Sequence, residues 1–579
     1  MSEQITKALL AKVIEAACEA ALDVLDDDPP PPPPLHADHG GPYEGVVGKA
    51  VEMDGRRSTG KIVSHEWQFG DGQSSKAETR PGVVSHTYRA PQTYPVALRV
   101  ESVDGFDVQR THIKIRPVSP PPPPPPDGRF AAPDGRDNAT GTWDDPWSFH
   151  DAVSSPKLTP GDTVYLRGGR YVLGRPVLVE LRGEPGNPIT FRPYEDEHVA
   201  LDFVLPGERD YLHFRIVGQW TEWRDIEFFN SDERTRVCPL GDHYRRGSIE
   251  VTGHHIAVIN CVIHDLMKGL SFWSAGHGGL AYGNLIYNCG TEAPDRAHGP
   301  GMYCQNTEGD LLLQHNIVLA SLSLGMQIYG SAAARLNNIT IDGNITAHNR
   351  DEMLFGGGQG IQGGVVRNNV FFGRDPKFGT SIQLDFEYPN HSLEVTKNKL
   401  YNCEARFDWN MQGKIAFREN TIAQLPYMDR KVVRCRKDMG ADVDWDNNKY
   451  YAPWPMSFAY GRRSKNWDQW KTETAVDSNS TWSPEVVDDR VHMFPNMGDE
   501  KLTTVVVTNW SQAESVTFSV PWPCQAVHVY DRQTVVANGD GTITLPMRDV
   551  SAPAAIGHLE RPTPVMPKEY GIFFLRKIA

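Results

Sequence analysis

Hydrophobic and polar positions alternate over much of the chain, and between residues 130 and 497 the alternating runs return at a regular spacing. Eight times an asparagine precedes a short apolar stretch, and the steps between these asparagines are 24, 32, 28, 25, 29, 22 and 27 residues. The asparagines are Asn260, Asn284, Asn316, Asn344, Asn369, Asn398, Asn420 and Asn447. A repeat of this length with β-type runs is typical of a parallel β-solenoid, in which each coil packs on its neighbours. We expect the asparagines to form a hydrogen-bonded ladder at an inward corner.

A second set of six runs lies between the asparagines and has matching alternation. The runs are 269–274, 301–306, 325–330, 352–357, 381–386 and 406–411. Because side chains on a strand alternate between its two faces, the second and fourth residues of each run should face the core: Leu270, Phe272, Met302, Cys304, Met326, Ile328, Met353, Phe355, Ile382, Leu384, Phe407 and Trp409. The third and fifth residues should then form an outer face: Ser271, Trp273, Tyr303, Gln305, Gln327, Tyr329, Leu354, Gly356, Gln383, Asp385, Asp408 and Asn410.

The remaining pattern predicts further parts on either side of the solenoid. Proline runs at 29–34 and 120–126 should adopt stiff, extended polyproline II and act as spacers. Ahead of them, apolar residues at helical spacing predict a short helix that serves as an anchor or oligomerisation element. After residue 498, about six short alternating runs predict a β-sandwich that caps the last coil. The expected fold is mostly β, and its parts are an N-terminal helix (1–28), a Pro-rich linker (29–41), a β-sandwich (42–117), a second Pro-rich linker (118–129), a right-handed parallel β-helix (130–497) and a C-terminal β-sandwich (498–579).

Two stretches of residues 42–117 resemble a known module. WQFGDG at 67–72 and HTY at 86–88 are similar to the polycystic-kidney-disease (PKD) repeat, an immunoglobulin-like β-sandwich. Gln68 and Gln92 stand where that family usually has Asp and Gly. The resemblance implies a module that spaces domains or binds extracellular polymers, without catalysis of its own.

The start of the solenoid resembles a second family. Segments 130–153, 158–172 and 186–202 are similar to the first coils of pectate-lyase-like right-handed parallel β-helix proteins, and DRAHGPGMYCQN at 295–306 resembles an element of uncharacterised members. The resemblance implies the right-handed parallel β-helix. It leaves the chemistry open, because that superfamily includes lyases, hydrolases, phage tailspikes and inert spikes.

Composition narrows the classes of function. The chain has 58 Lys and Arg against 73 Asp and Glu, a net charge of −15, which argues against a nucleic-acid partner. No uncharged apolar run is long enough to span a membrane. Lys7, Lys12 and Glu15 interrupt the apolar residues near the N-terminus, so no secretion signal is expected.

The predicted outer face has the mixture of groups that carbohydrate sites use, which is aromatic platforms beside amides and carboxylates. The expected carbohydrate-binding residues are Trp273, Gln305, Gln327, Tyr329, Gln383 and Asn410. Because the face crosses several coils, the expected partner is a polysaccharide or cell-surface glycan. The alternative is that any solenoid displays some polar and aromatic side chains by chance.

Four residues are candidates for catalysis: Asp385, Asp408, His298 and Tyr303. Hydrolysis would use a carboxylate pair, and sheet geometry puts Asp385 and Asp408 in different columns, roughly 8 Å apart, within the range of inverting glycosidases. Elimination would use a base beside a neutralised uronate, for which His298 or Tyr303 could move the proton. Whether the protein is an enzyme stays open here. No carboxylate cluster has metal-site spacing, so we expect no metal site and no cofactor, with Ca²⁺ as the alternative that lyase chemistry would add.

These observations favour a bacteriophage surface spike or fibre located at the virion surface. Residues 1–28 would attach it to the virion or another large assembly, and the β-helix would recognise host or environmental glycans and in one version cleave them. The first alternative is a bacterial polysaccharide lyase or glycoside hydrolase of the pectate-lyase-like superfamily, extracellular and exported without a classical signal. The second is a structural decoration without ligand. Analogy with β-helix spikes adds a homotrimer as an expectation.

Overall fold

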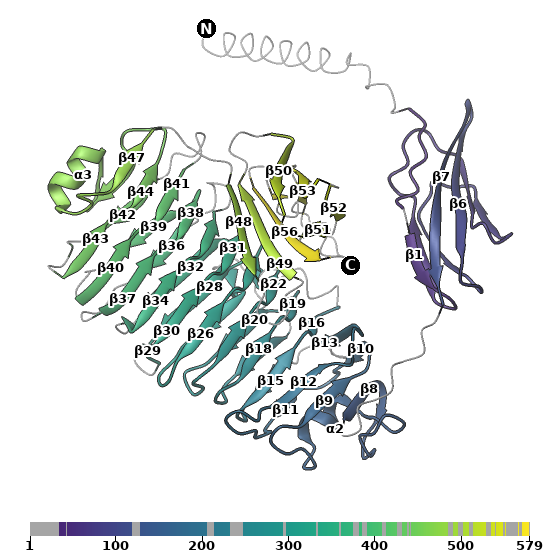
Figure 1. The fold of residues 1–579 in the computed structure, drawn as a ribbon, viewed down its shortest axis with the longest axis horizontal. Helices are drawn as coiled ribbons and strands as arrows, with labels where there is room; N and C mark the ends of the chain where they lie inside the picture. The colour runs from purple at the N-terminus through teal and green to yellow at the C-terminus, as the bar shows by residue number, and fades with distance from the viewer. Residues whose placement is uncertain are drawn as a thin grey trace, which may run out of the picture. The chain divides into compact units, whose positions relative to one another are not determined.

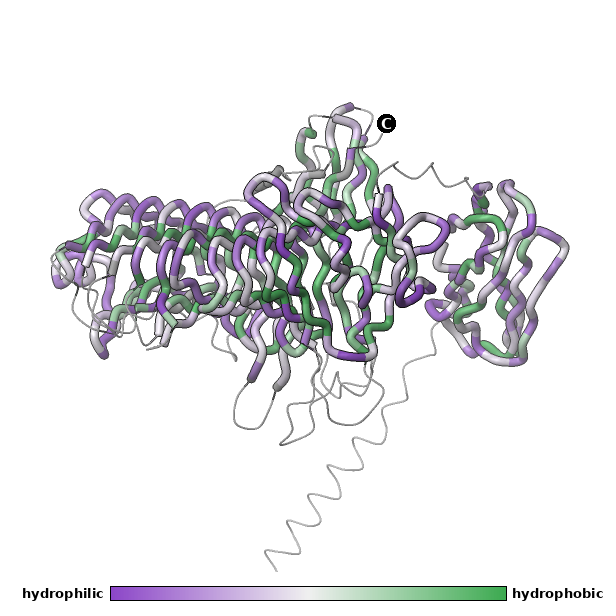
Figure 2. The backbone as a smooth tube through the Cα atoms, turned by 90° about the horizontal axis from the view of Figure 1, so that it is seen from below, coloured by the Kyte–Doolittle hydropathy of each residue, from purple (hydrophilic) through white to green (hydrophobic). Residues whose placement is uncertain are grey.

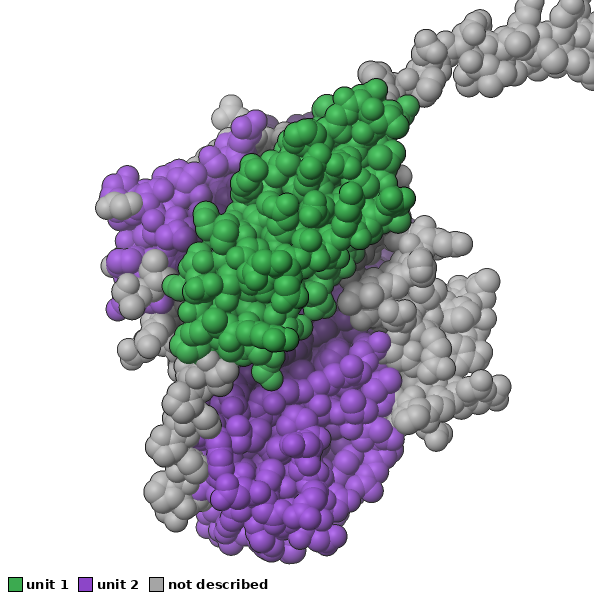
Figure 3. All heavy atoms as spheres, turned by 90° about the vertical axis from the view of Figure 1, so that its right-hand side faces the viewer, with its two compact units in different colours: residues 1–123 green, residues 124–579 purple. Residues whose placement is uncertain are grey.

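The computed structural model describes most of the chain from residue 34 onward. The described ranges are 34–41, 43–117, 128–204, 213–231, 247–292, 297–331, 334–357, 361–373, 381–384, 391–407, 413–424, 431–436, 439, 442–484, 490–495, 502–508, 513–520, 522–528, 534–538, 540–547, 550–551, 565–566 and 570–577. The expected helix at 1–28 and the proline runs lie outside them. The chain divides into two compact units, residues 1–123 and 124–579 (Figure 3).

Unit 1 is a β-sandwich, as its alternation predicts. A five-stranded sheet has the order β1-β7-β6-β3-β4 and faces the pair β2-β5. The strands are β1 (Tyr43–Val46), β2 (Ala50–Asp54), β3 (Ser64–Gln68), β4 (Ser74–Ala77), β5 (Val83–Thr87), β6 (Thr93–Ser102) and β7 (Gly105–Arg116). Trp67 and Leu98 lie fully buried between the layers. The His86 ring stacks on Phe69 with centroids 4.0 Å apart, and its Nε2 lies 2.8 Å from a carboxylate oxygen of Asp71.

Unit 2 is built around three parallel sheets of twelve strands each, which confirms the predicted β-helix (Figure 1). Sheet I contains β11 (Val177–Val179), β14 (His213–Ile216), β17 (Ser248–Val251), β20 (Lys268–Phe272), β25 (Met302–Cys304), β28 (Leu324–Gly330), β32 (Asp351–Gly357), β36 (Ser381–Leu384), β39 (Glu404–Phe407), β42 (Val433–Cys435), β45 (Phe458–Tyr460) and β46 (Arg463–Lys465), of which β46 is antiparallel to β45. Sheet II contains β8 (Arg129–Arg136), β9 (Thr163–Leu166), β12 (Ile189–Pro193), β15 (Thr221–Arg224), β18 (Ala257–Ile259), β21 (Leu280–Tyr282), β26 (Leu311–Gln314), β30 (Ile339–Asp342), β34 (Gly364–Arg367), β37 (His391–Thr396), β40 (Gly413–Arg418) and β43 (Val443–Asp446).

Sheet III completes each coil. It contains β10 (Gly169–Val172), β13 (Val199–Asp202), β16 (Glu227–Phe229), β19 (Val262–His264), β22 (Leu285–Tyr287), β27 (Ile317–Leu319), β31 (Ile345–Ala347), β35 (Val370–Phe372), β38 (Lys399–Tyr401), β41 (Thr421–Ala423), β44 (Lys449–Tyr451) and β47 (Thr481–Ser483). Two short pairs lie outside the three sheets: β23 (Thr291–Glu292) with β24 (Ala297–His298), and β29 (Leu336–Asn337) with β33 (Ile361–Gln362). Hydrophobic and hydrophilic positions recur in rows from coil to coil (Figure 2).

The predicted inward column is confirmed over its described side chains. Leu270, Met302, Met326 and Met353 pair in register on adjacent strands, and each is fully buried. The expected register of the sixth run is wrong by two residues. The alternation predicts that Phe407 pairs with Ile382, whereas in the structure Phe407 pairs with Leu384. A slip of two residues keeps every side chain on its face, so alternation alone does not detect it.

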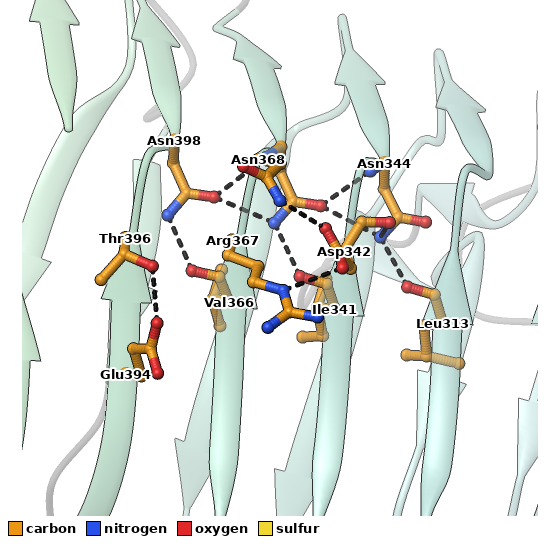
Figure 4. A network of polar contacts seen from close by, with 11 residues as sticks. Leu313, Ile341, Asp342, Asn344, Val366, Arg367, Asn368, Glu394, Thr396 and Asn398 are labelled. Carbon is orange, nitrogen blue, oxygen red and sulfur yellow. Dashed lines mark hydrogen bonds and ion pairs between the residues drawn. The ribbon is translucent and has the colours of Figure 1, made fainter. Parts of the chain in front are cut away.

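The asparagine ladder is present at the corner between sheets II and III. Each amide Nδ2 donates to a carbonyl of the preceding coil, and each Oδ1 accepts from the ladder asparagine there (Figure 4). Two of the predicted members are wrong by one residue. Cys261 and Asn448 occupy the ladder positions, whereas Asn260 and Asn447 are the corner residues before them, with φ of 54° and 60°.

The C-terminal residues form a sandwich of β48 (Arg490–Pro495), β49 (Leu502–Thr508), β56 (Tyr570–Lys577), β51 (Cys524–His528) and β52 (Thr534–Val536), facing β50 (Ser515–Ser519) with β53 (Thr542–Pro546); β54 (Val550–Ser551) pairs with β55 (Val565–Met566). The expectation that it caps the last coil is wrong. Val506 and Ile572 pack on outward residues of sheet III such as Leu319 and Val370. The solenoid ends are instead covered by two short helices, α2 (Phe149–Ser154) and α3 (Trp467–Thr474) (Figure 1).

Candidate functional site

The outward residues of sheet I lie in register across the coils. One row, called here the outer row, runs through Arg215, Glu250, Ser271, Tyr303, Gln327, Leu354, Gln383, Arg406 and Arg434. Neighbouring strands of a sheet lie about 4.8 Å apart, so consecutive members can touch the same ligand. Towards its N-terminal end the row brings charged side chains beside aromatic ones.

A buried carboxylate is the centre of the charged part. Glu250 is 4% exposed, and its Oε2 lies 3.1 Å from Nδ1 of His213 and 3.3 Å from a guanidinium nitrogen of Arg215. Its Oε1 accepts from Lys268 Nζ at 3.3 Å and from the Ser248 hydroxyl at 3.1 Å. Burial disfavours the ionised form of Glu250, but the hydrogen bond from His213 and the charge of Lys268 outweigh it and lower the pKa to about 2.

A β-bulge puts Lys268 on the outer face. Ser248 pairs with Lys268 but the next residue, Ile249, pairs with Leu270, so Gly269 is the extra residue. A bulge of this kind re-aims the side chain next to it. Plain alternation would place Lys268 on the same side as Leu270, in the core. A Cβ at Gly269 would come within 2.3 Å of the Gly301 carbonyl oxygen, which favours glycine at this place.

Two aromatic rings adjoin the charged group. The Trp273 and Tyr303 centroids are 5.0 Å apart with the planes tilted by 41°, and Lys268 Nζ lies 4.7 Å from the Trp273 ring centre. Burial raises the pKa of Tyr303, so its phenol stays protonated near neutral pH, and its oxygen accepts a hydrogen bond from the Gln305 amide. The site cluster is defined as His213, Arg215, Glu250, Lys268, Trp273 and Tyr303.

Gln305 links three coils next to these rings. Its amide nitrogen lies 3.2 Å from the Tyr303 hydroxyl and 3.1 Å from the Tyr329 carbonyl oxygen, and its amide oxygen accepts from the Ser274 backbone at 3.3 Å. The side chain is 6% exposed. Gln305 therefore holds the aromatic rings in place, and a direct contact with glycan stays a prediction.

The other predicted site residues are spread over different surroundings. Gln327 and Tyr329 lie half-buried in β28. His298 lies in β24, which pairs with β23 outside sheet I. Asp385, Asp408 and Asn410, and the side chain of Gln383, lie outside the described residues, so the proposed carboxylate pair stays a prediction.

Sequence reasoning missed Glu250, Lys268, His213 and Arg215. SIEV at 248–251 does alternate, and that would have placed Glu250 outward. The asparagine repeat does not extend to the coil of Glu250, because the ladder begins at Cys261. Lys268 was not expected on the outer face, because the bulge interrupts the alternation there.

The described residues hold no group of three or more His, Cys, Asp or Glu side chains arranged to bind a metal ion. No step is assigned to Ca²⁺. No helix in the described part of the chain is long and apolar enough to cross a bilayer.

Two family models match parts of the chain. Residues 129–309 match the model described as "Pel9A-like, right handed beta helix region", and residues 32–116 match that of the PKD domain. The site cluster lies within the first match. Residues 32–116 of unit 1 thus match a PKD domain, and residues 129–309 of unit 2 match a Pel9A-like right-handed β-helix.

Parts of the chain are also similar to three known proteins. A pectate lyase, PEL9, of Emericella nidulans is 35% identical over 115 residues, which is 17% of this chain and 27% of that protein. A collagenase, ColA, of Bacillus cereus is 40% identical over 68 residues, 11% of this chain and 7% of that protein. The crystal structure of pectate lyase Pel9A aligns with 62% of this chain and 78% of its own, at 13% identity and a TM-score of 0.34. The chain thus spans about a quarter of the pectate lyase's length and far less of the collagenase.

Proposed function

We propose that the protein binds an acidic, uronate-containing polysaccharide across the outer face of sheet I and cleaves it by β-elimination. The observation that carries the proposal is Lys268, which a bulge places on this face between Glu250 and the Trp273 ring. The Pel9A-like match over residues 129–309 and the partial identity to a pectate lyase support the same class of reaction. This favours the polysaccharide-lyase alternative over a spike without enzymatic activity.

The site cluster suits an anionic sugar despite the negative charge of the whole chain. The Arg215 guanidinium brings a permanent positive charge, and Lys268 adds a second when its amine is protonated; Glu250 offsets one of them. The Trp273 and Tyr303 rings offer a flat surface for the face of a sugar ring. A substrate carboxylate next to Arg215 would form charge-assisted hydrogen bonds, which withdraw electrons from the adjacent carbon and make its proton easier to remove.

β-Elimination needs one base and no carboxylate pair. The base takes the proton from C5 of the uronate, the electron pair forms the C4–C5 double bond, and the C4–O bond breaks with the departing oxygen taking up a proton. Lys268 is the member of the cluster suited to this step when its amine is neutral, because a guanidinium stays protonated in proteins. Glu250, with its pKa near 2, remains ionised at neutral pH and cannot serve as the acid that hydrolysis would require.

The test is turnover of polygalacturonate, followed by the ultraviolet absorbance of the unsaturated product. Lys268→Ala and Lys268→Arg should each lower the rate by about 10²-fold or more, the usual contribution of a positioned base. Lys449→Ala is the matched control, since Lys449 is an exposed lysine of β44 in sheet III. New reducing ends without unsaturated product, or full activity in Lys268→Ala, would overturn the proposal.

Location at a virion surface, attachment through residues 1–28 and assembly as a homotrimer stay predictions. Cleavage does not decide between them and an extracellular bacterial enzyme, since either can carry such a site. Sedimentation of the full chain with purified phage particles, compared with a chain lacking residues 1–28, separates the two locations.

A further inference from the structure

A hollow lies on sheet II, on another face of the β-helix from the site cluster. It has a volume of about 420 Å³ and crosses four consecutive strands, β34, β37, β40 and β43. Its lining includes Val365, Ser392, Glu394, Lys414, Ala416, Asp442 and Asp444. Ligand pockets are commonly 300–1,000 Å³ in volume, so this groove can hold about two sugar rings.

Small outward side chains make the hollow. Val365, Glu394, Ala416 and Asp444 pair in one outward row, and Ser392 pairs with Lys414 in the row beside it. Val365, Ser392 and Ala416 have short side chains, so the bottom of the groove lies close to the backbone. The longer side chains beside them form its walls. Val365 and Ala416 also offer apolar atoms that the C–H face of a sugar can contact.

The charged walls of the groove are exposed and carry both signs. Glu394, Lys414, Asp442 and Asp444 are all exposed. One oxygen of Glu394 accepts from the Thr396 hydroxyl at 2.8 Å (Figure 4), and one of Asp444 accepts from Arg418 at 2.6 Å, which leaves a second oxygen on each for a ligand. Lys414 and Asp442 have no ion-pair partner among the described residues.

This lining selects against acidic ligands. An acidic polymer would approach the carboxylates of Glu394, Asp442 and Asp444, which outnumber the ammonium group of Lys414, and would meet like charges. Hydroxyl groups avoid that conflict, because they donate to the carboxylates and accept from the ammonium group. We infer that this groove is a second saccharide site that holds two or so residues of a neutral glycan. Its place on sheet II separates it from the acidic-polymer site on sheet I.

The experiment is electrophoresis through gels that contain galactan, arabinan, xylan or amylose, with polygalacturonate as a fifth gel. The full chain should be retarded in at least one neutral gel. Ala416→Trp, which fills the groove, and Lys414→Ala should each weaken that retardation at least fivefold. Thr190→Trp is the matched control, because Thr190 is a half-buried residue of β12 between buried neighbours on the same sheet.

Each outcome bears on the groove separately from the cleavage reaction. Ala416→Trp should keep the elimination activity that Lys268→Ala loses, so failure of one proposal does not hide the other. The groove proposal is overturned if no neutral gel retards the chain, or if Ala416→Trp migrates like the unchanged chain. It is also overturned if the effect of Ala416→Trp is confined to the polygalacturonate gel.

Discussion

At the scale of single residues, Glu352 is a carboxyl group placed where water does not reach it. It is fully buried at the start of β32, and its two oxygens accept from the backbone and side-chain nitrogens of Asn349 at 3.1 and 2.6 Å. Burial raises the pKa of Glu352 from 4.5 to about 8, and the Asn349 hydrogen bonds offset only part of that rise. Asn349 in turn accepts from the Ser321 backbone of the preceding coil. Glu352 therefore joins the coils as a neutral acid.

Glu352 should make the β-helix less stable as pH rises. Between pH 4.5 and about 8 the folded state keeps a proton that the unfolded state releases, so this contribution is complete below pH 4.5 and is lost by pH 8. The pKa difference corresponds to roughly 3–5 kcal/mol over that window. The side chain in Glu352→Gln cannot ionise, so the free energy of unfolding should lose the part of its pH dependence that Glu352 causes. This holds even if the substitution changes the free energy of unfolding at every pH. Denaturant unfolding of both chains at pH 5, 6.5 and 8 measures it, and parallel pH profiles would contradict the assignment.

At the scale of elements, the two ends of the solenoid are closed by helices with different supports. In α2, Phe149 packs near Tyr171 and Phe214 of the first coils. In α3, Trp470 stacks on Phe458 with centroids 5.2 Å apart, and its indole nitrogen donates to Asp477 at 2.8 Å. Asp477 also accepts from Asn448, the last asparagine of the ladder. The same carboxylate thus ends the ladder and holds the helix that covers the last coil.

Trp470→Ala should open that end of the solenoid. It removes a fully buried indole and leaves Asp477 without one of its donors, at a cost of about 3–5 kcal/mol. Hydrogen exchange should speed up in β44 and β45 and stay slow in β28, which lies near the middle of the β-helix. Thr472→Ala, at an exposed position of α3, is the control and should leave exchange unchanged. Equal exchange in Trp470→Ala and the unchanged chain would show that α3 does not protect the last coil.

At the scale of the whole β-helix unit, one strand of the C-terminal sandwich contributes to two cores. Ile572 of β56 packs towards sheet III, whereas its neighbour Phe573 packs inside the sandwich. In β49, Val506 and Val505 divide in the same way. The outward residues of sheet III under this contact are apolar, unlike those of sheet I. The period of two in β49 and β56 therefore fastens the sandwich along the side of the solenoid, on sheet III and not on sheet I.

Ile572→Asp should detach the sandwich from sheet III. The carboxylate would be buried without a partner, which costs several kcal/mol, while the sandwich keeps its own core. Amide exchange should then rise in β27, β31 and β35, and elimination activity at sheet I should be retained. Val536→Asp, at a position that is 57% exposed, provides the comparison. Slow exchange in those three strands after Ile572→Asp would mean that the contact does not hold the sandwich.

Much of the architecture follows from periods in the sequence. Alternation placed Leu270, Met302 and Met326 in one inward column, because side chains two apart share a face whatever the neighbouring strands do. The asparagine spacing located the ladder, but Asn260–Cys261 and Asn447–Asn448 each offered two positions. The corner needs a residue that tolerates positive φ and the ladder needs an amide, and asparagine suits both.

What the tertiary structure alone decided is the assembly of the candidate site and the place of the terminal sandwich. Glu250 of β17 gathers His213 and Arg215 from β14 and Lys268 from β20, and Lys268 reaches that face through a bulge that alternation cannot express. The sandwich packs on the apolar outward residues of sheet III. The sequence does not reveal this contact, because the apolar surface exists only once many coils have stacked. Local patterns determine which way a strand faces. Contacts between distant coils depend on register, bulges and the surface that the stacked coils build together.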